Sequence, residues 1–321
     1  MTQSAAAATK DRPASSGWWA RLPPAAGSAV MATGIVSVGL RLVGWPVPST
    51  VLLVLAMAGW ILLALAFAVE FLRDRRRWVA DLGTAPALTA VAATAVLGTR
   101  LSAAGWQTTA AALLAVATVV WPGILLTVLR HWQHHLPGAS FLVCVATQGL
   151  AVLAGTLALA HQGDWLVWPA LAAFSLGLAL YVAALLRFDL RQVERGAGDQ
   201  WIAAGALGIS ALAASRLTQW PHWHPVHPVL RIATLVLLAL DLAWYVVLLA
   251  AEVRRPRRHY NIRRWATVFP LGMTAVATLS TATAAHVSWL TPVGRVLLWI
   301  AVAAWLLTAG MLAATEARRV G

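Results

Sequence analysis

The stretch STVLLVLAMAGWILLALAFAVEFL, residues 49–72, decides the fold class of this chain. Its twenty-four residues include a single charged side chain, Glu70, close to the end. An α-helix needs about 20 mostly apolar residues to cross the hydrocarbon core of a bilayer. The apolar residues run on without the alternation expected of transmembrane β-barrel strands. The stretch therefore predicts a membrane-spanning helix.

Similar apolar stretches recur along all 321 residues, of which 60% are hydrophobic and only 11% charged. A soluble domain carries about 25% charged residues. We expect residues 1–17 to form a disordered cytoplasmic tail and residues 18–316 to form one transmembrane domain. The predicted spans of this all-α polytopic protein are 25–43, 49–72, 84–101, 107–129, 137–160, 164–187, 200–219, 226–251, 265–289 and 292–314.

The net charge of +13 is distributed as membrane topology requires, which argues against a nucleic-acid partner. Basic residues gather in the cytoplasmic loops of membrane proteins. With a cytoplasmic N-terminus and ten spans, 19 of the 24 Lys and Arg residues lie on the cytoplasmic side. We therefore expect a bacterial-type cytoplasmic (plasma) membrane protein with both termini inside the cell.

The predicted spans alternate in composition, which indicates a hairpin repeated five times. Even-numbered spans are rich in Leu and Val, whereas odd-numbered spans are rich in Gly, Ala, Ser and Thr. Small residues allow membrane helices to approach closely. We expect the odd-numbered helices to form an inner ring in quasi-fivefold arrangement around a central pore, with the even-numbered helices facing lipid.

Helix-breaking and small residues recur on the odd-numbered spans. Proline kinks a membrane helix where the freed backbone group is buried in protein or faces water. Ordinary close packing is the alternative explanation, because glycine and proline are common in membrane helices. The candidate pore-lining or kink residues are Gly34, Pro86, Gly149, Gly205, Gly208, Gly272 and Thr274.

Basic residues lie near the outer ends of all the odd-numbered spans. They are Arg41, Arg100, His161, Arg216 and His286. Basic rings favour anions in pores, so these residues predict an electropositive outer mouth. Snorkelling to lipid headgroups is the alternative. No acidic residue lies well inside an odd-numbered span, which argues against a cation pathway.

One acidic residue, Asp241, lies in the middle of the eighth span. An ionisable group at that depth is costly and is a functional candidate. Asp241 is a candidate for proton coupling, and the alternative is a structural role, either an ion pair with Arg231 or a hydrogen bond to a neighbouring helix. The sequence lacks the common catalytic and nucleotide-binding motifs, so we expect neither an enzyme nor a cofactor. The sequence contains two histidine clusters, one of His131, His134 and His135 and the other of His222, His224 and His227. They lie on opposite sides of the predicted membrane, so we expect no metal site.

Four segments carry a family resemblance. SAVMATGIVS at 28–37, VATQGLAVL at 145–153, WIAAGALGIS at 201–210 and WATVFPLG at 265–272 resemble the first, fifth, seventh and ninth helices of the tellurite-resistance/dicarboxylate transporter family. That family includes the TehA-like proteins and the slow-type anion channels of plants. The Phe-Pro pair of the last segment is the most specific match.

The resemblance implies ten helices in five hairpins, a homotrimer with one pore per subunit, and a pore occluded by Phe269 next to the kink at Pro270. The function it implies is transport of small inorganic or carboxylate anions across the lipid bilayer. One alternative is a proton-coupled carrier of four-carbon dicarboxylates such as malate, or a sulfite exporter. A membrane scaffold that conducts nothing is a second alternative.

Overall fold

The computed structural model describes residues 26–75, 81–133, 135–223, 226–257 and 260–320, and these residues are helical with no β-strand. The predicted tail, residues 1–17, lies outside them. Short 3-10 turns and one short helix are η4 (Ala85–Ala87), η5 (Gly138–Phe141), η6 (Asp164–Leu166), α8 (Gln192–Arg195), η7 (Asp199–Trp201) and η8 (Ile262–Arg264). The longer helices are α1 (Gly27–Leu42), α2 (Pro46–Arg73), α4 (Leu88–Ser102), α5 (Gln107–Arg130), α6 (Leu142–Leu159), α7 (Val167–Leu185), α9 (Ile202–Thr218), α10 (His227–Arg254), α11 (Trp265–Ala284) and α12 (Leu290–Val320).

Eight of the described helical segments are long and apolar enough to cross a membrane. They contain α2, α5, α6, α7, α9, α10, α11 and α12, whereas α1 is a shorter apolar helix of 16 residues. Two predicted boundaries differ clearly from the structure. The ninth span was expected to reach residue 289, but α11 ends at Ala284 because His286 takes a left-handed conformation with φ 53°. The last helix continues past residue 314 to Val320, through a polar segment that contains Glu316 and Arg318.

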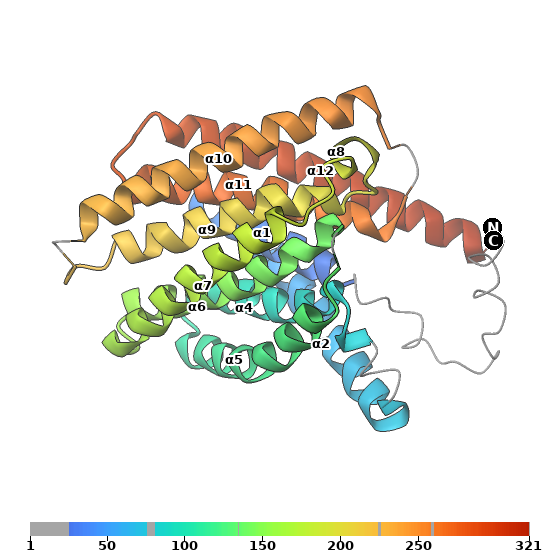
Figure 1. Cartoon of the computed structure of the whole chain (residues 1–321), viewed down its shortest axis with the longest axis horizontal. Coiled ribbons are helices and arrows are strands. Elements are labelled where there is room, and N and C mark those ends of the chain that lie inside the picture. The colour runs from blue at the N-terminus through green and yellow to red at the C-terminus, as the bar shows by residue number, and fades with distance from the viewer. Residues whose placement is uncertain (1–25, 76–80, 134, 224–225, 258–259, 321) are drawn as a thin grey trace.

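Five helices contact one another in a closed cycle: α1 packs against α4, α4 against α6, α6 against α9, α9 against α11, and α11 against α1. Each of the other long helices packs against the cycle from outside. They are α2, α5, α7, α10 and α12, and each contacts the helix that precedes it in the chain. Figure 1 shows these outer helices flanking the central group. We call α1, α4, α6, α9 and α11 the inner ring.

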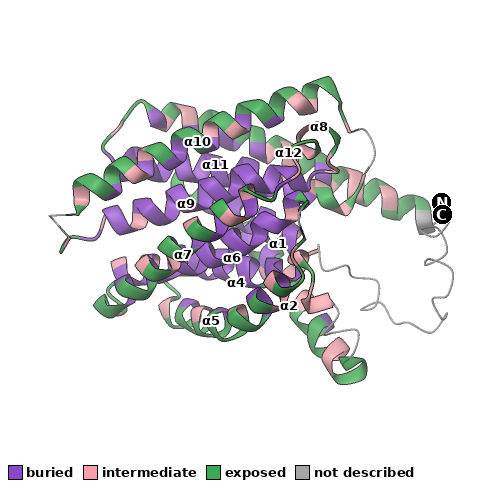
Figure 2. Ribbon diagram, viewed as in Figure 1, coloured by how far each residue is buried: buried purple, intermediate pink, exposed green. Residues whose placement is uncertain are grey.

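Burial separates the inner ring from the outer helices. Between 89 and 94% of the residues are buried in the spanning windows that contain α6, α9 and α11, against 22 to 39% for α2, α5, α7, α10 and α12. In Figure 2 the inner helices are mostly purple and the outer helices mostly green. The composition difference along the sequence therefore corresponds to position: small residues pack inside, and Leu and Val face outward.

Neighbouring helices of the inner ring run parallel, as contacts at two levels show. Gly138 at the start of the α6 segment lies against Asp199 at the start of the α9 segment, and Gly155 near the end of α6 lies against Arg216 near the end of α9. Gly27 and Gly34 of α1 likewise meet Thr89 and Val96 of α4. All the C-terminal ends of the inner helices therefore lie on one side.

The outer helices hold the ring through one repeated polar position. Trp60 of α2 and Trp121 of α5 are each the fifteenth residue of their helix. Their Nε1 atoms donate to Thr94 of α4 at 2.8 Å and to Thr147 of α6 at 3.0 Å. Trp305, the sixteenth residue of α12, donates to Thr33 of α1 at 3.0 Å.

The same position differs in α10. Its fifteenth residue is Asp241, which accepts a hydrogen bond from Thr274 of α11 at 3.1 Å. Each of these outer helices thus reaches the inner helix of the following hairpin, and α12 reaches back to the first. Only the carboxylate reverses the direction of the hydrogen bond, because it accepts where the indoles donate.

Candidate functional site

A small cavity lies inside the inner ring and is lined by all five of its helices. Its volume is about 10 Å³ for the centre of a water-sized sphere, which is room for about one water molecule. The wall is mostly apolar. The lining residues are Ile35, Val38, Ala95, Val96, Thr99, Gly149, Val152, Ile209, Leu212, Arg216 and Met273.

Phe269 lies in α11, one turn before Met273, which lines the cavity. Residues four apart on a helix lie close to one face, so Phe269 and Met273 share a side of α11, and Phe269 is not itself among the residues that line the cavity. Its side chain is 1% exposed. A Cβ added to Gly205 of α9 would lie 3.2 Å from Cε1 of the Phe269 ring and 2.9 Å from Cγ of Pro270. The Phe269 ring therefore packs directly against the backbone of α9.

The predicted glycines lie at the contacts between inner helices. A Cβ added at Gly34 would lie 2.9 Å from Val96, and one added at Gly208 would lie 3.1 Å from Met273. A Cβ added at Gly272 would lie 2.8 Å from Ile35. Gly149 also lines the cavity, where its Cβ would lie 3.1 Å from Ala95. These positions allow the close approach that narrows the space at the axis.

The two predicted prolines differ in their settings. Pro270 lies inside α11, where it cannot donate to the carbonyl of Ala266 and so weakens the helix beside Phe269. Pro86 lies in the 3-10 turn η4, which precedes α4. A proline at the start of a helix costs no hydrogen bond, because the first N–H groups have no partner within the helix.

The predicted basic residues all lie near the C-terminal ends of the inner ring, in different environments. Arg41, His161 and His286 are exposed, and both histidines take positive φ just after their helices, at 57° and 53°. Arg216 lines the cavity. Arg100 is 3% exposed and does not line it.

Arg100 is bound by two serines at the interface of α1, α2 and α4. Its Nε donates to Ser37 Oγ at 3.0 Å, and its Nη2 donates to Ser49 Oγ at 3.0 Å. The serine hydroxyls in turn donate to each other's backbone carbonyls. This arrangement fixes the guanidinium between helices and satisfies part of its hydrogen-bonding capacity.

Asp241 is fully buried between α9, α10 and α11. Its Oδ1 accepts from Thr274, while Oδ2 has no hydrogen-bond partner among the described residues and lies close to Gly208. Thr274 points at this carboxylate and is absent from the cavity wall. The carboxylate contacts α9 and α11 on the sides that face α10, and it does not line the cavity.

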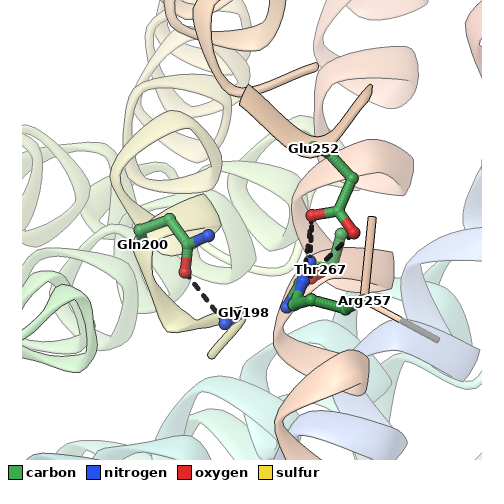
Figure 3. Close-up of polar contacts among 5 residues, drawn as sticks. All are labelled: Gly198, Gln200, Glu252, Arg257 and Thr267. Carbon is green, nitrogen blue, oxygen red and sulfur yellow. Dashed lines mark hydrogen bonds and ion pairs between the residues drawn. The ribbon is translucent and has the colours of Figure 1, made fainter. Parts of the chain in front are cut away.

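Charged and polar contacts lie at the opposite end of the ring, at the starts of α9 and α11. Figure 3 shows Arg257 between Glu252, near the end of α10, and Thr267, in the first turn of α11. The Nε of Arg257 lies 3.0 Å from Glu252 Oε2, and its Nη2 donates to Thr267 Oγ1 at 3.0 Å. Gln200 meanwhile accepts from the backbone N–H of Gly198 at 2.8 Å. These contacts tie the α10–α11 connection to the ring.

Most of the cavity wall was not identified from the sequence. Ile209, Leu212 and Arg216 are spaced three and four residues apart and form one face of α9. That helical spacing could have marked the face, but the uniformly apolar sequence hides which face points inward. Among the described residues, no group of three or more His, Cys, Asp and Glu side chains is placed to hold a metal ion. His134 and His224, each a member of a predicted histidine cluster, lie outside those residues.

The chain is similar to other membrane proteins. Two uncharacterized membrane proteins of Mycobacterium tuberculosis, from strains CDC 1551 and H37Rv, are each 30% identical over 139 residues, which covers 40% of this chain and 70% of theirs. Residues 21–313 match the SLAC1 family, described as voltage-dependent anion channel. This multi-pass membrane protein therefore belongs to the voltage-dependent anion channel family.

Proposed function

We propose that this protein transports small anions through a pore along the axis of the inner ring. The single observation that carries the proposal is the cavity on that axis, which all five inner helices line and no acidic side chain among the described residues enters. Family membership supports anion transport in general. In this proposal ten helices cross the membrane as five hairpins in quasi-fivefold order.

Phe269 is the proposed gate. Its ring lies one turn from Met273 on the cavity face and packs against Gly205, so it closes the axis on the side of the helix starts. Pro270 supports this role, because the missing hydrogen bond to Ala266 lets α11 bend next to the ring. A small tilt of α11 would carry the ring away from the axis.

The proposed orientation places the starts of the inner helices in the cytoplasm, with both termini inside the cell and the protein in the plasma membrane. Helices α1 and α4 are shorter than a lipid-facing span, but they are surrounded by other helices and need not match the hydrocarbon thickness alone. The family resemblance further leads us to propose a homotrimer, which the mass of the purified complex in detergent tests.

A second candidate function is a proton-coupled carrier of four-carbon dicarboxylates or of sulfite. The observation that favours it is the buried carboxylate of Asp241, whose Oδ2 has no partner among the described residues. Asp241 lies behind the helices that hold Phe269, so its protonation would act on them through Thr274 and Gly208.

Flux into proteoliposomes separates the two candidates. Purified protein is reconstituted, and uptake of nitrate and of malate is followed with and without an imposed proton gradient. Passive nitrate flux that equilibrates its own gradient supports the pore. Accumulation of malate above equilibrium, driven only by the proton gradient, supports the carrier. Liposomes that stay tight to nitrate, sulfite and malate contradict both candidates.

A further inference from the structure

Arg216 is a charged residue without a counter-ion inside an apolar cavity. Among the residues that line the cavity and are described by the structure, it alone carries a charge. Its Nε is buried and has no hydrogen-bond partner, and no described carboxylate forms an ion pair with it. The residue as a whole is partly exposed, and a cation within a membrane protein is costly unless an anion, water or hydrogen-bond acceptors compensate it.

Two hydroxyl groups of α11 lie at the level of Arg216. Gly205 lies beside Phe269 and Gly208 beside Met273, so residues 64 or 65 positions apart are level on the parallel helices α9 and α11. This register places Arg216 level with Ser280 and Thr281. Ser280 is seven residues beyond Met273, as Arg216 is beyond Ile209, so both continue the cavity-facing sides of their helices.

The hydroxyl groups of Ser280 and Thr281, like the Nε of Arg216, are buried without a hydrogen-bond partner among the described residues. Most threonines of the ring behave differently: Thr94, Thr99 and Thr278 donate to a carbonyl of the preceding turn. Thr281 is seven residues beyond Thr274 and so shares the side of α11 that faces Asp241. Arg216 and Ser280 are the unsatisfied polar groups on the cavity-facing sides, and they form a donor pair for a ligand because buried polar groups are normally hydrogen-bonded.

We propose that Arg216, with Ser280, forms a binding site for one small monovalent inorganic anion at the C-terminal end of the cavity. The site rests on the proposed pore and gives it its substrate class. A single guanidinium neutralises one negative charge, so a dianion would keep an uncompensated charge among apolar walls.

Anion-dependent thermal unfolding of the detergent-solubilised protein tests the site without any transport step. Sodium nitrate is titrated against sodium gluconate at constant ionic strength, because a ligand that binds the folded state raises its melting temperature. We expect a saturable rise with nitrate for wild type. Arg216→Gln should weaken nitrate binding at least tenfold, and Ser280→Ala should weaken it several-fold. Arg130→Gln, which removes an exposed charge at the end of the outer helix α5, should leave it unchanged.

The result that overturns the site is equal nitrate stabilisation in Arg216→Gln and wild type, or no saturable nitrate effect in wild type. If Arg216→Gln does not fold, Ser280→Ala and Arg216→Lys decide in its place. Arg216→Lys keeps the charge and should bind nitrate more weakly than wild type. The double variant Arg216→Lys/Ser280→Ala should bind nitrate more weakly still. Nitrate binding without flux in liposomes would contradict the pore alone, whereas nitrate flux with unchanged binding in Arg216→Gln would contradict the site alone.

Discussion

The aromatic ring of Phe269 on α11 packs against Gly205 on α9, where an added Cβ would lie 3.2 Å from Cε1. The contact joins the proposed gate to the neighbouring helix at a position with no side chain. Pro270 lies beside the same glycine, with Cγ 2.9 Å from that Cβ position. The absence of a methyl group at residue 205 therefore determines where the ring can rest.

Gly205→Ala tests this contact. The added methyl group has to displace Phe269 or Pro270, and overpacking of this kind costs about 1–3 kcal/mol. We expect a lower free energy of unfolding in mixed detergent micelles. Gly123→Ala in α5 is the matched control, because nothing lies within 4 Å of its Cβ position. A control variant destabilised as much as Gly205→Ala would show that close packing at Gly205 is not the cause.

Arg100→Lys tests whether this buried residue is a structural link. A lysine cannot reproduce the planar fork that reaches both Ser37 and Ser49. We expect a loss of about 1–3 kcal/mol in unfolding free energy, since hydroxyl groups of two helices lose a charged partner. Arg41→Lys at an exposed site should stay within about 0.5 kcal/mol of wild type. Equal stabilities of the two variants would argue that the serine contacts contribute nothing.

Asp241→Asn separates a structural carboxylate from a proton-coupling one. The amide keeps an oxygen that can accept from Thr274 and has nearly the same volume. The pore account predicts that nitrate flux in this variant stays within about twofold of wild type. A twofold change in flux corresponds to less than about 0.5 kcal/mol in the free-energy barrier to transport. Loss of uphill, proton-driven malate or sulfite uptake in the variant would favour the carrier instead.

Trp121→Phe measures the repeated link between outer and inner helices. It removes the indole N–H that donates to Thr147 at 3.0 Å and leaves most of the aromatic packing in place. We expect a loss of about 0.5–1.5 kcal/mol in unfolding free energy. Trp106→Phe, at an exposed residue before α5, provides the control. The link is unimportant if both substitutions have the same small effect.

The sequence was sufficient to predict the inner and outer helices, because membrane burial selects composition directly. Small residues mark helices that touch other helices on every side, and Leu and Val mark helices that face lipid. The contact cycle of the five inner helices follows the same division. Boundaries were less predictable at α11, where the left-handed turn at His286 depends on local backbone geometry.

The directions of individual side chains could not be predicted from composition. Successive residues of a helix point about 100° apart, so a basic residue near a helix end gives no information about which neighbour it faces. Thr99 lines the cavity, whereas Arg100, the next residue, turns to Ser37 and Ser49. The acceptor on α2 lies 51 positions away in the chain, a pairing that only the packed helices create.

The most direct test of the central claim is the anion conductance of purified protein in planar bilayers, with wild type compared to Phe269→Ala. Phe174→Ala is the control, because it removes a buried phenylalanine that belongs to the outer helix α7 and not to the inner ring. The account predicts a small wild-type current, a strong rise in Phe269→Ala alone, and reversal potentials that follow the nitrate gradient. Silence of Phe269→Ala, with fold and oligomeric state intact, would contradict a pore closed by Phe269.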